Sequence, residues 1–181
     1  MNGFLIALKS ELFIALRTFS NKLILVAPAL LISLQNITLW LAERGRETRD
    51  SLLGDSGFDE LVSDNAYGYF VDSMSTGLAM LGLLLVAQAA YSFSYERDTG
   101  MIRHLLIRRV SRPALMVAKL VHLNLLGLAS FTMLLVVGYF LCGLLWEFGP
   151  IVEDGFELIS ESEILLEIHT GLMLAAVPFP A

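Results

Sequence analysis

Three long apolar runs, separated by segments that carry nearly all of the charge, constrain this chain more than any other feature. The runs cover residues 23–42, 74–93 and 115–146. About 20 residues of α-helix cross the hydrocarbon core of a bilayer. Charged residues make up only 17% of the 181-residue chain, whereas average soluble domains contain about 25%. The pattern therefore predicts three membrane-spanning helices in a polytopic membrane protein.

The two ends of the chain add a helix and part of another to this all-α membrane helix bundle. Residues 1–22 place their apolar side chains on one face of a helix, with Glu11 and Arg17 opposite. The apolar set is Phe4, Leu5, Leu8, Leu12, Leu16 and Phe19. Such a helix lies in the membrane interface, although packing against another subunit is an alternative. Residues 164–181 are apolar to the last residue, so we expect the chain to be a piece that stops within a fourth span.

The basic residues indicate how the spans are oriented. Nine of the 12 Lys and Arg residues lie in residues 1–22 and 94–120. The segments 43–73 and 147–163 are rich in Asp and Glu. Short loops that remain in the cytoplasm carry an excess of Lys and Arg. We therefore predict a cytoplasmic N-terminus, a cytoplasmic segment at 94–114 and two acidic extracytoplasmic loops.

No residue pattern in the chain indicates a catalytic or metal site. Cys142 is the only cysteine, so there is no internal disulfide and no cysteine cluster for a metal. The sequence has no Walker-type phosphate loop, no Gly-x-Ser-x-Gly and no His-Glu-x-x-His. His122 and His169 lie near the ends of apolar runs, which favours interfacial placement over a proton path. An intramembrane enzyme is disfavoured because no paired catalytic groups share a depth.

The segment 94–114 has the pattern of two turns around a short helix. Asp98 or Thr99 can cap a helix that runs to about Arg109, and Ser111 can cap the next one. The apolar face of the short helix consists of Met101, Ile102, Leu105 and Leu106. A short helix across the membrane plane can transmit force from a soluble partner to the two spans that it joins.

Several residues of this segment resemble a family signature. Glu96, Thr99-Gly100, Val110-Ser111-Arg112 and Lys119 resemble the motif of permeases from the type-2 exporter branch of ATP-binding-cassette (ABC) transporters. The resemblance covers about residues 1–147. It implies that the helix near 99–109 is a coupling helix, seated in a groove of a cytoplasmic ATPase. The residues predicted to couple to that partner are Glu96, Thr99, Gly100, Met101, Leu105, Arg108, Ser111 and Arg112.

The same residues also have less specific explanations. Glu96 can lie at a solvated helix end, and Gly100 can serve a tight turn without contacting a partner. The arginines can orient the chain and bind anionic lipid headgroups, each contributing about 1 kcal/mol. The apolar face around Leu105 is the feature that lipid headgroups explain least.

The resemblance predicts that the chain is a permease subunit of an ATP-driven ABC exporter in a bacterial inner membrane. The chain is expected not to be an enzyme and to bind no cofactor, with ATP and Mg²⁺ on a separate ATPase subunit. Expected partners are that ATPase, a second permease copy or paralogue, membrane lipid and a possible periplasmic protein, but no nucleic acid. The alternative is a non-transporting membrane anchor or assembly subunit that recruits cytoplasmic or periplasmic partners.

Overall fold

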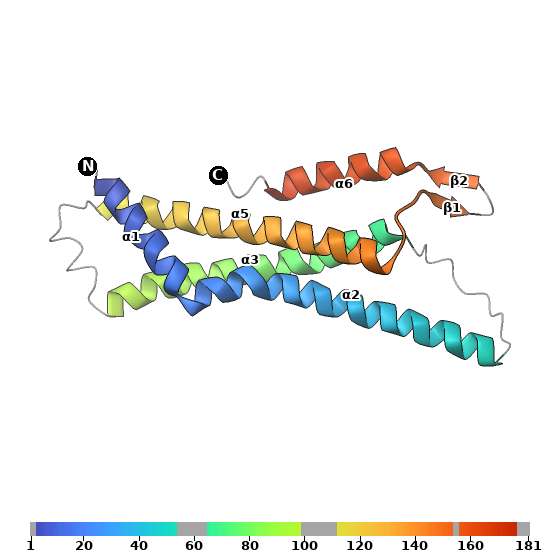
Figure 1. Cartoon of the computed structure of the whole chain (residues 1–181). Coiled ribbons are helices and arrows are strands. Elements are labelled where there is room, and N and C mark those ends of the chain that lie inside the picture. Colours follow the sequence, from blue (N-terminus) through green and yellow to red (C-terminus); the bar gives the residue numbers. More distant parts are fainter. Residues whose placement is uncertain (1–2, 54–64, 99–111, 154–155, 177–181) are drawn as a thin grey trace. The chain divides into compact units, whose positions relative to one another are not determined.

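Three long helices dominate the computed structural model, which describes residues 3–53, 65–98, 112–153 and 156–176 (Figure 1). They are α2 (Phe19–Leu53), α3 (Ala66–Asp98) and α5 (Arg112–Leu145). Each contains a stretch long and apolar enough to cross a membrane: Phe19–Arg46, Ala66–Ser92 and Pro113–Leu145. The prediction of an all-α membrane bundle with three full spans is confirmed.

Four shorter elements complete the described chain. They are α1 (Gly3–Arg17), β1 (Ile151–Glu153), β2 (Phe156–Ile159) and α6 (Glu161–Ala176). The two strands pair antiparallel between α5 and α6, with Val152 opposite Glu157 (Figure 1). This hairpin was not predicted, because 147–163 was expected to be an acidic loop. The available signal was Asp154-Gly155 between two short runs of apolar residues, a pattern typical of hairpins.

The long helices continue beyond the apolar runs. α2 reaches Leu53, so the first part of the predicted loop 43–73 is helical, and α3 begins at Ala66. Arg, Glu and Leu, which are frequent at the end of α2, are good helix formers in water as well as in lipid. Asn65 caps α3, because its Oδ1 accepts a hydrogen bond of 3.0 Å from the amide of Tyr67. Helix propensity and capping, not hydropathy, therefore determine where these helices end.

One half of a capping box begins α6. The Ser160 amide donates to Oε2 of Glu163 at 3.2 Å, and the Ser160 hydroxyl donates to the same oxygen at 3.1 Å. Ser followed three residues later by Glu is the sequence form of this motif. As a result, α6 begins at Glu161, three residues before the fourth span predicted at 164–181.

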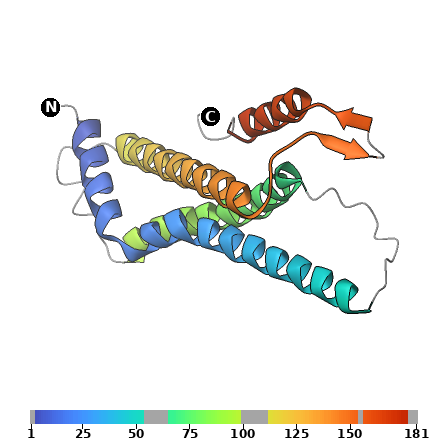
Figure 2. The ribbon, with the colours of Figure 1, turned by 45° about the vertical axis from the view of Figure 1, so that its right-hand side comes forward.

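The described residues form two compact units. The first contains the described parts of Met1–Pro28 and Leu78–Met133, and the second those of Ala29–Gly77 and Leu134–Pro178. In the first unit, Ala7 of α1 packs with Ala118 of α5 in a buried core. Their partly buried neighbours are Phe4, Leu8 and Ala114. Figure 2 shows α1 turned steeply away from the start of α2 and lying next to the beginning of α5.

Close helix packing forms the core of the second unit. Ile32 and Leu134 are fully buried there. A Cβ on Gly77 would lie 2.6 Å from Cδ1 of Leu134 and 2.9 Å from Cγ2 of Ile32. Small residues allow helix backbones to approach closely in membranes, where association depends on packing. Gly77 thus permits α3 to pack directly against the other two long helices.

Proline 28 lies inside α2 without ending it. Because proline has no N–H, the carbonyl of Ile24 loses its partner within the helix. The Ser130 hydroxyl of α5 donates to that carbonyl at 2.7 Å, and Ser130 is buried. A side chain from a neighbouring helix thus satisfies a backbone group that lipid cannot.

Replacing Ser130 with alanine should lower the free energy of unfolding by about 1–3 kcal/mol, because a buried carbonyl then has no donor. Thr132→Ala is the matched control, since Thr132 is exposed and, within the described residues, its hydroxyl bonds only to the Leu128 carbonyl of its own helix. Unfolding in mixed micelles by increasing sodium dodecyl sulfate measures both. Equal losses for the two variants would contradict the repair of the Ile24 carbonyl.

Candidate functional site

A buried ion pair joins α1 to α5 in the first unit. Nζ of Lys119 lies 3.4 Å from Oε1 of Glu11, and the two side chains are only 3% and 12% exposed. The same Nζ donates to Oγ of Ser92 on α3 at 2.7 Å. Removing charges from water is costly, so a buried ion persists only with close partners. Lys119 therefore holds three helices together.

A chain of hydrogen bonds joins α3 and α5 to the start of α2. The Ser20 hydroxyl donates to Oε1 of Gln88 at 2.5 Å, and Nε2 of Gln88 donates to Oδ1 of Asn21 at 2.9 Å. Nδ2 of Asn21 lies 3.5 Å from Nε2 of His122. Nδ1 of His122 is buried and has no hydrogen-bond partner in the described part of the chain. Together with Glu11, Ser92 and Lys119, these four residues form what we call the polar cluster.

The polar cluster lies on the helices that flank the predicted coupling segment. Glu96 belongs to the last turns of α3, and Arg112 is the first residue of α5. The side chains of these two residues are not described. The other predicted coupling residues lie outside the described residues: Thr99, Gly100, Met101, Leu105, Arg108 and Ser111. Their contacts with an ATPase stay predictions.

Some members of the polar cluster were singled out from the sequence, and others were not. Lys119 was part of the family motif, and His122 was noted as a polar group near the end of an apolar run. Glu11 was placed on the polar side of an interfacial helix, whereas it points inward to Lys119. Gln88 and Ser92 were missed. A lone amide in an apolar run was the available signal for Gln88, because buried amides bond to neighbouring helices.

A second set of polar contacts links three helices in the second unit. The Tyr69 hydroxyl of α3 donates to Oε1 of Glu43 on α2. Nε1 of Trp146, just after α5, donates to Oε2 of the same carboxylate at 2.7 Å. The rings of Tyr69 and Trp146 stack with centroids 4.2 Å apart. Each oxygen of Glu43 thus has its own donor, and the contacts join α2 at Glu43 to the start of α3 and the end of α5.

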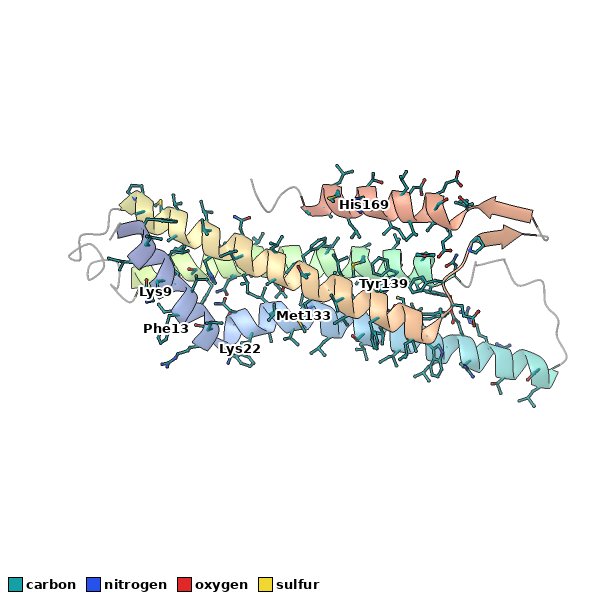
Figure 3. The ribbon with its side chains drawn as sticks, turned by 45° about the horizontal axis from the view of Figure 1, so that its top comes forward. Lys9, Phe13, Lys22, Met133, Tyr139 and His169 are labelled. Atoms are coloured by element: carbon teal, nitrogen blue, oxygen red, sulfur yellow. The ribbon has the colours of Figure 1, made fainter. Side chains whose placement is uncertain are left out.

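The second unit also contains a cavity of about 440 Å³. Tyr139 of α5 and His169 of α6 are part of its wall (Figure 3). The other lining residues are Tyr67, Phe70, Leu135, Leu165, Ile168 and Leu172. Within the described residues no group of His, Cys, Asp and Glu is arranged to hold a metal ion. The lining suits an apolar group and shows no catalytic arrangement.

Comparison with known families decides the class of the protein. A family model described as "ABC-2 family transporter protein" matches residues 52–180. The chain belongs to this family. It is therefore a multi-pass membrane permease subunit of an ABC transporter, and an ATPase partner is implied. No curated protein and no solved structure matches the chain.

The ABC-2 match covers α3, the segment 99–111, α5 and α6. The predicted resemblance to type-2 permeases is thereby confirmed. Four residues of the polar cluster lie inside the matched range: Gln88, Ser92, Lys119 and His122. Glu11 precedes that range, so the contact between α1 and the ABC-2 region is a finding of the structure alone.

Proposed function

We propose that this ABC-2 permease exports its substrate, driven by ATP that a separate cytoplasmic ATPase hydrolyses. ATP and Mg²⁺ bind to that subunit, and this chain has no catalytic role of its own. The working unit contains two permease chains, identical or paralogous, and two ATPase chains. Closure of the ATPases displaces the coupling helices and switches the spans between inward-open and outward-open states.

The polar cluster is the observation that supports this mechanism best. It bonds α1, α3 and α5 to one another on either side of the segment 99–111. A force applied to that segment therefore moves α1, α3 and α5 together. Lys119 is central because its ammonium contacts a carboxylate on one helix and a hydroxyl on another.

The distribution of charge supports a bacterial inner membrane with the N-terminus in the cytoplasm. Nine of the 12 basic residues lie within residues 1–22 or 94–120. In α1 and at the start of α2, Lys9, Arg17 and Lys22 are all exposed. Positive residues in short loops remain on the cytoplasmic side. The proposed coupling segment then lies on the side where ATP is available.

Co-purification tests the proposal against a non-transporting anchor. The tagged chain is produced in its native host, solubilised in mild detergent and purified together with the proteins that remain bound to it. We expect a stable complex with one ATPase per permease. The Glu163→Gln variant, changed at an exposed residue of α6, is the control and should retain the ATPase. A pure permease without an ATPase, or with only traces of it, would favour the anchor.

A further inference from the structure

The side of α1 that faces away from α5 combines apolar and basic side chains. Phe13 is 58% exposed, and Leu16 and Phe19 are each 76% exposed. We call this surface the outer face of α1. It comprises Leu5, Ile6, Lys9, Leu12, Phe13, Leu16 and Arg17, and it continues through Phe19 and Lys22 at the start of α2. Figure 3 shows Lys9, Phe13 and Lys22 on this surface.

The charged side chains of the outer face are all positive. Lys9, Arg17 and Lys22 are exposed, and none of them has an acidic partner among the described residues. The guanidinium of Arg17 lies 4.6 Å from the centroid of the Phe13 ring, within the same surface. Glu11 is the only acidic residue before Glu43. Because Glu11 is buried against Lys119, its charge is removed from the outer face.

We propose that the outer face of α1 binds the headgroups of anionic phospholipids. Only Thr18 separates α1 from α2, whose apolar stretch begins at Phe19. The outer face therefore lies at the edge of the bilayer. Its apolar side chains enter the acyl region, while the long stems of Lys9 and Lys22 extend their ammonium groups to the phosphates.

Two features favour lipid over a protein as the occupant. Exposed phenylalanine and leucine side chains next to a spanning helix contact lipid acyl chains directly, so no protein partner is needed to cover them. The three cations complement a surface of negative headgroups, and burial of Glu11 leaves no acid to repel it. This inference rests on α1 and its packing, and it holds whether the chain transports a substrate or only anchors other proteins.

The expected lipid preference follows from the charges. A basic residue close to an anionic membrane surface strengthens binding by about fivefold. Removing Lys9 and Lys22 together should reduce the preference for anionic over zwitterionic lipid by about 25-fold. High salt should weaken the preference in the unsubstituted chain, because mobile ions screen exposed charges.

Quenching by brominated lipid measures this preference in the full chain. The F13W variant places an indole on the outer face, and the chain without this change supplies the background from Trp40 and Trp146. The chain is reconstituted in phosphatidylcholine vesicles with a minor fraction of dibrominated phosphatidylglycerol or dibrominated phosphatidylcholine. We expect stronger quenching by the phosphatidylglycerol, and a much smaller difference between the two lipids in the K9Q/K22Q variant, which retains Arg17 alone.

A matched control changes two exposed arginines near the other end of α2, Arg46→Gln and Arg49→Gln. This variant has the same change of charge and should keep the preference. Equal quenching by the two brominated lipids in the F13W chain would overturn the proposal, since the face would then bind lipid without regard to charge. Absence of quenching by either lipid would also overturn it, because a protein surface would then cover α1.

Discussion

Replacing Lys119 with methionine is expected to lower the free energy of unfolding by about 3–5 kcal/mol, the usual result of leaving one buried charge without its partner. Methionine retains much of the apolar stem of lysine and loses the ammonium group. Glu11, at 12% exposure, then keeps a negative charge that water cannot solvate well. The hydroxyl of Ser92 loses a hydrogen bond as well.

The double variant Glu11→Gln with Lys119→Met is the control for this prediction. It removes both charges, and a buried pair replaced by neutral groups is often nearly neutral for stability. We expect the double variant to recover most of the loss, as measured by unfolding in mixed micelles. If Lys119→Met alone cost no more than the double variant, the ion pair would not hold α1 in place.

Much of the bundle could be predicted because lipid imposes a simple rule on sequence. A span must be apolar over about 20 residues, and the three runs meet that condition. The continuation of α2 to Leu53 was not predicted, because hydropathy reports only the part of a helix inside the membrane. The hairpin at 151–159 was missed for a related reason. The acidic residues around it indicated exposure to water, so the segment was predicted to be a loop.

The contacts of the polar cluster could not be predicted from the sequence. Lys119 was singled out as part of the family motif, and His122 as an ionisable group near the end of an apolar run. Their partners Glu11 and Asn21 lie far away in sequence. Helical periodicity assigned Glu11 to the polar face of α1, because that reasoning assumes that a charged side chain faces water. Packing of Ala7 on Ala118 turns that side of the helix inward and brings the two charges together.

Replacing Leu105 with glutamate should have the largest effect on function. Leu105 belongs to the apolar face of the proposed coupling helix, and we expect it to enter the groove of the ATPase. A charged side chain in an interface core weakens binding by about 2 kcal/mol or more, over tenfold in affinity. The permease should remain in the membrane, because the three spans are unchanged, while the ATPase is lost or no longer coupled. Gly100→Glu should act in the same way.

Ile159→Glu is the matched control for this change. Ile159 is an exposed residue of β2, so the variant introduces the same charge in place of a similar apolar side chain. It lies in the segment predicted to be extracytoplasmic, away from the proposed ATPase contact. We expect it to behave as the unchanged chain in both membrane insertion and ATPase association.

ATP turnover by the reconstituted complex tests the central claim most directly. The unchanged chain, the L105E variant and the I159E variant are each purified with the ATPase and compared in vesicles for bound ATPase and for ATP turnover that depends on the permease. Coupling through the segment 99–109 predicts that only L105E loses bound ATPase or permease-dependent turnover. An L105E complex with a full complement of ATPase and unchanged turnover would contradict it.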